Sequence, residues 1–83
     1  MAVCICDSCM APLEAEQIYA IGPLGGIPTD PSPKAQGAAK VYRLLCKSCF
    51  VPLYEDHGYD ATEAKLLKSR TVAKEHLKLT GRL

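Results

Sequence analysis

One pattern, Cys-x-Ser-Cys-x-x-Pro-Leu, occurs twice in this chain, as CDSCMAPL at residues 6–13 and as CKSCFVPL at residues 46–53. Each copy opens with a Cys-x-x-Cys pair. Two such pairs, well separated along a chain, are typical of a tetrahedral site in which four thiolates bind one metal ion. The repeat therefore predicts a metal site whose ligands are Cys6, Cys9, Cys46 and Cys49.

Zinc is the ion that this ligand set indicates, and iron is the alternative, because four thiolates also suit iron. A shell of four cysteines leaves no coordination position open for water, so a catalytic metal is not expected. The two histidines, His57 and His76, stand in polar surroundings and are interpreted as surface residues. No nucleophile can be assigned outside the metal cysteines. We expect one structural zinc ion and no enzymatic activity.

The length of the chain makes a bound metal important for stability. Its 83 residues are enough for one domain. Chains near this size bury a thin core, and this one contains one Phe, four Tyr and no Trp. Because metal binding and folding are one event in such domains, the ion would supply the missing stability. The prediction is a small metal-stapled α+β fold.

The N-terminal sequence and the hydropathy indicate the compartment. The chain opens without a basic segment and a long apolar run, and no apolar stretch approaches the length of a membrane span. We therefore expect a cytoplasmic protein without a membrane partner. In such a reducing compartment, paired cysteines bind metal rather than form disulfides.

A fifth cysteine, Cys4, precedes the first pair. Aligning the two repeats places it opposite Leu44, at an apolar position, and a free cysteine packs as a small hydrophobic residue. Cys4 is therefore interpreted as a packing residue. The competing interpretation makes Cys4 a ligand in place of Cys6 or Cys9.

The segment between the repeats is predicted to form a β-hairpin that brings the two cysteine pairs side by side. Strands are expected at residues 15–21 and 40–46, where Ile, Tyr, Val and Leu favour a pleated surface. Residues 22–39 are rich in Gly, Pro and Ala, and prolines lack a backbone donor, so a long mobile tip loop is expected there. Residues 50–59 are expected to form a linker with at most one short helical turn.

One long helix is predicted over residues 61–80. Asp60 is a good N-cap, Glu63 completes a capping-box-like pattern, and Gly81 is the expected stop. One narrow face has the spacing of a core stripe and carries Thr62, Leu66, Ser69, Ala73, Leu77 and Thr80. Because only three of these residues are apolar, the C-terminal half of the helix is expected to project from the metal core or to pack only partly on the hairpin.

The charge is unevenly distributed along the chain. Residues 1–60 hold four Lys or Arg against seven Asp or Glu, whereas residues 61–83 hold six against two. The basic residues of this second part are predicted to bind the partner, and they are Lys65, Lys68, Arg70, Lys74, Lys78 and Arg82. We therefore divide the single domain into a zinc module at residues 1–59 and a basic helix at residues 60–83.

The predicted layout, two zinc knuckles bridged by a β-hairpin and followed by a C-terminal α-helix, resembles the zinc ribbons. It is also similar to the treble-clef zinc fingers, in which a hairpin and then a helix follow the first knuckle. The resemblance covers residues 4–53 and implies the four-cysteine ligand set. Two features depart from it. Met10 and Phe50 stand where a ribbon knuckle often has Gly, and Pro52 with the linker holds the main helix back to about residue 61.

Proteins of these groups commonly serve nucleic-acid machinery, and others are protein adaptors. We expect a nucleic-acid-associated or transcription-machinery-binding module that acts through its basic helix. The alternative is an interaction adaptor, or a small inhibitor of a larger protein, without nucleic-acid contact. The near-neutral total charge and the apolar helix edge at Val72 and Leu79 favour this alternative. Neither interpretation includes a small-molecule substrate.

Overall fold

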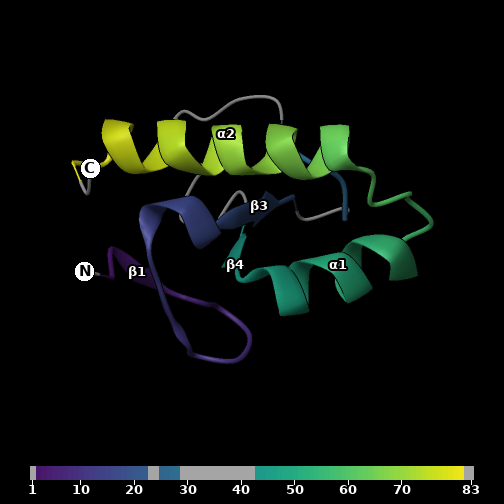
Figure 1. The fold of residues 1–83 in the computed structure, drawn as a ribbon, viewed down its shortest axis with the longest axis horizontal. Coiled ribbons are helices and arrows are strands. Elements are labelled where there is room, and N and C mark those ends of the chain that lie inside the picture. Colours follow the sequence, from purple (N-terminus) through teal and green to yellow (C-terminus); the bar gives the residue numbers. More distant parts are fainter. Residues whose placement is uncertain (1, 23–24, 29–42, 82–83) are drawn as a thin grey trace, which may run out of the picture.

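The computed structural model describes residues 2–22, 25–28 and 43–81. It has the predicted small α+β character (Figure 1), with β1 paired to β2 and β3 paired to β4, both antiparallel. In chain order the elements are β1 (Cys4–Ile5), β2 (Pro12–Leu13), the 3-10 turn η1 (Ala15–Gln17), β3 (Tyr19–Ile21), β4 (Arg43–Leu45), α1 (Lys47–Asp56) and α2 (Glu63–Leu79).

The predicted strand over residues 15–21 is confirmed only at its end. Residues 15–17 form η1 instead, because Glu14 and Gln17 close a capping box around that turn. The strand begins at Tyr19, which lies opposite Leu45 of β4. The predicted hairpin therefore exists, but its first strand is shorter than expected.

Helix α1 is the main departure from the predictions. The sequence predicts a linker at residues 50–59, whereas a helix covers Lys47–Asp56 and contains Pro52. A proline inside a helix removes one hydrogen bond and crowds the preceding turn. Phe50 and Tyr54 lie one turn apart on α1, and both are buried, which offsets the cost of the proline. Their packing outweighs the proline.

The start of α1 changes the predicted layout of the cysteines. Cys46 is the N-cap of α1, and Cys49 lies in its first turn. The second pair is therefore carried by a helix N-terminus, and the predicted two-knuckle layout is not confirmed.

Helix α2 begins two residues later than predicted. Its N-cap is Thr62 rather than Asp60, and the Thr62 hydroxyl accepts a hydrogen bond of 3.3 Å from the backbone N–H of Lys65. The predicted stop is found where expected. Gly81 has a φ of 79°, in the left-handed region that favours glycine after a helix.

The core lies between α2 and the β3–β4 pair, and Figure 1 shows α2 running along this pair. The predicted stripe is confirmed at its centre, since Leu66, Ser69, Ala73 and Leu77 are all buried. The Ser69 hydroxyl donates a 2.8 Å hydrogen bond to the carbonyl of Ala20 in β3. Of the two predicted arrangements for the C-terminal half of α2, projection from the core is wrong, because Ala73 and Leu77 in that half are buried.

Four stacked aromatic rings connect β3, α1 and the turn after it. Ring centroids are 5.3 Å apart for Tyr19 and Phe50, 5.1 Å for Phe50 and Tyr54, and 5.0 Å for Tyr54 and Tyr59. Offset stacking at these distances is favourable. The aromatic residues that the structure describes are thus concentrated around α1.

Several predicted features lie outside the described residues. These are most of the tip loop at residues 22–39, residues 40–42 of the return strand, and Arg82. In the part of the chain that the structure describes, neither helix has the length and apolar character needed to span a bilayer.

Candidate metal centre

The first cysteine pair lies in the tight turn between β1 and β2. The backbone N–H of Cys6 donates to the Ala11 carbonyl at 2.9 Å, and the N–H of Met10 donates to the Cys6 carbonyl at 3.1 Å. The Cys6 thiol accepts two longer hydrogen bonds, from the N–H of Ser8 at 3.4 Å and of Cys9 at 3.5 Å. The turn therefore forms a knuckle that directs both sulfur atoms to one side.

A left-handed residue closes this knuckle. Met10 has a φ of 66°, a conformation that costs a bulky residue free energy and that glycine adopts readily. The resemblance to ribbon knuckles implies glycine at this position. In this structure methionine occupies the position in the left-handed conformation, with its side chain 69% exposed.

Three hydrogen bonds join the knuckle to β4, from which the second pair follows. The N–H of Asp7 donates to the Leu44 carbonyl at 3.0 Å, and the Asp7 carboxylate accepts from the N–H of Leu44 at 3.2 Å. The N–H of Cys46 donates to the Cys6 sulfur at 3.4 Å. These contacts hold the N-terminus of α1 against the knuckle.

Asp7 is a functional residue that the sequence predictions missed. It occupies the second position of the repeated motif, where the second copy has Lys47. This difference within the repeat is the signal that could have identified it. Only in the first copy does the side chain at this position bond to the backbone of the other segment, at Leu44.

The four predicted ligands converge on one point. Their sulfur atoms all lie within 4.8 Å of one another, and those of Cys9 and Cys46 are 3.7 Å apart. A tetrahedral ion with bonds of about 2.3 Å to sulfur places its ligands about 3.8 Å apart. The cluster therefore fits a metal ion bound by Cys6, Cys9, Cys46 and Cys49.

The electrostatics of the cluster also suit a cation. Burial raises the pKa of the Cys6 thiol, but the N–H groups of Cys9, Cys46 and Ser8 outweigh it and lower that pKa to about 6. Contacts within the cluster, first with Cys46, together with burial raise the pKa of Cys49 to about 12. A divalent ion among these thiols would favour the thiolate at each position.

Other candidate ligands are not part of this cluster. Cys4 lies in β1 opposite Leu13, and the group of possible ligands within the described residues includes neither Cys4 nor a histidine. The ligand set that the repeat predicts is therefore the set that the fold brings together.

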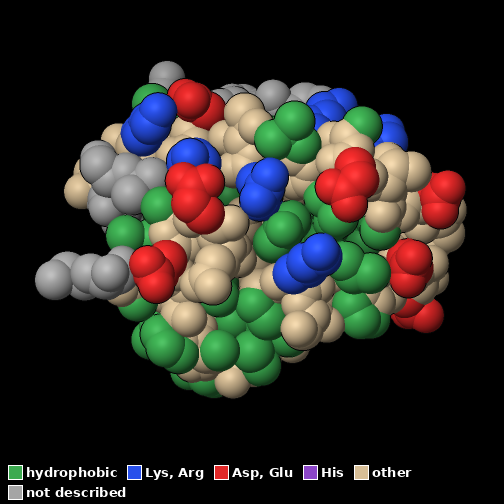
Figure 2. Space-filling model, viewed as in Figure 1, with side chains coloured by type: hydrophobic (Ala, Val, Ile, Leu, Met, Phe, Trp, Pro, Cys, Tyr) green, Lys and Arg blue, Asp and Glu red, His purple; other side chains and the backbone are tan. Residues whose placement is uncertain are grey.

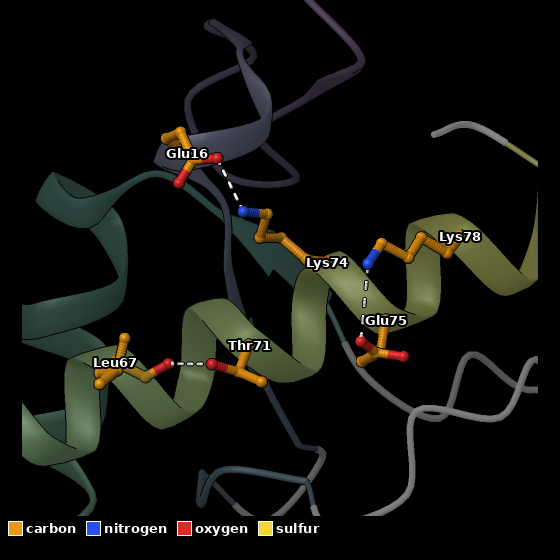
Figure 3. Close-up of polar contacts among 6 residues, drawn as sticks. All are labelled: Glu16, Leu67, Thr71, Lys74, Glu75 and Lys78. Carbon is orange, nitrogen blue, oxygen red and sulfur yellow. Dashed lines mark hydrogen bonds and ion pairs between the residues drawn. The ribbon is translucent and has the colours of Figure 1, made fainter.

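Nearby carboxylates partly neutralise the basic residues of α2 that are predicted to bind the partner. Figure 3 shows Lys74 directed towards Glu16 of η1, with its Nζ 2.7 Å from the carboxylate. The Lys74 hydrogen bond, and then its charge, lower the pKa of Glu16. Lys78 forms a weaker pair with Glu75 at 3.9 Å. These lysines are engaged within the chain.

The remaining predicted partner-binding residues lie on two sides of α2. Lys65 and Lys68 are exposed, and Arg70 is half-buried. The apolar edge is only partly available, because Val72 packs against the core while Leu79 is 54% exposed.

Comparisons with known proteins identified no relative of this chain. No protein-family model, no curated protein and no solved structure matches this chain. The case for its function rests on the cluster and the surfaces around it.

Proposed function

We propose that this protein is a structural-zinc module that binds another protein and catalyses no reaction. The observation that carries the proposal is the convergence of four sulfur atoms from a knuckle and a helix N-terminus. Four cysteines make a closed shell around zinc, which suits stabilisation rather than catalysis.

The position of the cluster supports a stabilising role. Between residues 2 and 13 only Cys6 and Leu13 are buried, so the β1–β2 hairpin has little core of its own. An ion bound by all four cysteines would join this hairpin directly to the start of α1. Metal binding would then contribute directly to the free energy of folding.

Metal analysis of the purified protein tests this role. We expect one zinc ion per chain, and we expect chelation to remove both the metal and the cooperative unfolding transition. Iron bound in its place would colour the protein. A metal-free protein that keeps the same transition would contradict the proposal.

The charge pattern favours a protein partner over a nucleic acid. In Figure 2 basic and acidic side chains are interspersed along α2 rather than gathered by sign. Nucleic-acid binding depends on a basic patch that replaces counterions around the phosphates. The ion pairs of Lys74 and Lys78 reduce that potential.

Crosslinking in cell extract, with and without nuclease, separates these two classes of partner. We expect the crosslinked species to be a protein and to survive nuclease and moderate salt. Loss of the species with nuclease, or a steep fall with salt, would support the nucleic-acid module instead.

A further inference from the structure

A cleft lies between the start of α1 and the first half of α2. Its volume is about 330 Å³, and Tyr19 of β3 contributes to its lining. Lys47 lines it from α1, and Glu63 and Arg70 line it from α2. We call it the α1–α2 cleft. It lies outside the metal ligands, because none of the four cysteines lines it.

Two positive groups line this cleft. Among the described residues, no ion pair is formed by Lys47 of α1 or Arg70 of α2, whereas Lys74 and Lys78 of α2 each form one. The charge of Arg70 also helps to lower the pKa of Glu16, although Lys74 is the main cause. Lys47 is exposed and Arg70 is half-buried. A guanidinium and an ammonium that line one cleft are suited to bind a single carboxylate by charge-assisted hydrogen bonds.

An apolar surface adjoins these charges. Leu67 lines the same cleft and is 57% exposed, although it is a large hydrophobic residue. Ala64 lies one turn before it on the same helix face and also lines the cleft. The cleft therefore offers a place for an apolar side chain beside the site for a carboxylate.

We propose that the α1–α2 cleft binds a segment of a partner protein in which an acidic residue stands next to an apolar one. Lys47 and Arg70 bind the carboxylate, and Leu67 covers the apolar side chain. The proposal rests on the proposed function, because it names the surface through which the zinc module would bind a protein.

Glu63 favours a peptide over a nucleic acid at this position. Its carboxylate lines the cleft together with the two cations. A strand of successive phosphates would bring further negative charge close to Glu63, and like charges at short range repel. A single carboxylate brings less negative charge near Glu63 than a strand of phosphates does.

A displayed library of random linear peptides, selected on the zinc-loaded protein, tests the proposal. We expect enrichment of peptides with Asp or Glu beside Leu, Ile or Phe. In a nitrogen-15 NMR titration, these peptides should shift the amide signals of Lys47, Ala64, Leu67 and Arg70. Replacing the peptide acid by its amide should weaken binding roughly tenfold, the loss expected for one charge-assisted bond.

Charge reversal identifies the residues that act. The variant Lys47→Glu with Arg70→Glu should lose binding of the enriched peptides, while its NMR spectrum and zinc content remain those of a folded protein. The matched control is Lys65→Glu with Lys68→Glu, which reverses two exposed charges elsewhere on α2. It should bind the peptides as the wild type does.

The possible outcomes distinguish a failure of the cleft proposal from a failure of the proposed protein-binding function. Two results would show that the peptide site is not the α1–α2 cleft, while the proposed protein-binding function would stand. In one, the enriched peptides shift NMR signals outside the cleft. In the other, they bind the Lys47→Glu, Arg70→Glu variant as tightly as the wild type. Failure to enrich acidic and apolar peptides would also overturn the cleft. Mixed-sequence single-stranded RNA that binds where peptides do not would overturn both proposals.

Discussion

At the scale of single residues, Cys6 and Cys9 differ in burial and in hydrogen bonding, although both belong to the same Cys-x-x-Cys pair. Cys6 is fully buried and its sulfur accepts three backbone N–H groups, whereas Cys9 is exposed. Cys6 therefore contributes both to the core and to the cluster. Cys9 contributes through its sulfur alone, which makes it the sharper test of metal binding.

Cys9→Ser should abolish stable zinc binding, although it removes no buried side chain. We expect zinc content well below one ion per chain, measured by native mass spectrometry, together with a loss of the folded NMR spectrum. Cys4→Ser is the matched control and should keep the ion. Equal damage from both substitutions would show that the ligand set is wrong.

Glu16 should titrate below the ordinary range of a glutamate. The Lys74 hydrogen bond and charge lower its pKa, so this ion pair is present above the ordinary pKa and is lost as pH falls through the lowered one. NMR titration of the Glu16 carboxyl signal measures this shift directly. In Lys74→Met the pKa should return towards its ordinary value, and in Lys65→Met it should not change.

At the scale of elements, packing rather than local preference decides where the helices lie. Helix α1 forms through Pro52 because Phe50 and Tyr54 are buried on one face. Helix α2 lies on β3 because Ala73 is small and Ser69 satisfies a strand carbonyl. Each helix is fixed by a few side chains that contact a strand distant in sequence.

Pro52→Ala should stabilise the protein. Alanine restores one hydrogen bond within α1 and removes the steric conflict of the proline, and Pro52 is exposed, so little packing is lost. We expect a gain of about 1–3 kcal/mol in the free energy of unfolding, reduced by the greater freedom of the unfolded chain. Chemical denaturation of the zinc-loaded protein measures it. Pro12→Ala, outside both helices, should give no such gain.

Ser69→Ala should loosen the contact of α2 with β3. The change removes a buried hydroxyl that donates to the Ala20 carbonyl, and such a loss costs about 1–3 kcal/mol. Thr71→Ala on the same helix is the control, since its exposed hydroxyl bonds only the Leu67 carbonyl one turn back. Equal stability of the two variants in denaturant would show that the Ser69 bond does not hold the helix.

At the scale of the whole molecule, the cysteine cluster and the helices share one buried core. Cys6 belongs to the same buried cluster as Phe50 and Leu77, although only Cys6 is a predicted ligand. We therefore expect stability gained by metal binding to extend to α2 through the core. A module of this size has little reserve once the ion is removed.

Chelation should therefore expose α2 as well as the knuckle. Hydrogen exchange of the zinc-loaded protein should show protected amides at Ala73 and Leu77, and EDTA should remove that protection together with the protection of Phe50. Protection of α2 that survives chelation would mean that the helix and β3 fold without the metal. Readdition of zinc should restore the original pattern.

The sequence by itself determined the ligand set, the core stripe of α2 and the end of that helix. Each follows from a local rule: the spacing of thiols, the helical period and the left-handed glycine at Gly81. Only the tertiary structure decided that the second pair starts a helix and that α2 lies flat on β3. It also placed Lys74 against Glu16 and brought Lys47 and Arg70 to one cleft. These features depend on contacts between distant segments, whose packing outweighs the local preference of Pro52 and the weak apolar stripe of α2.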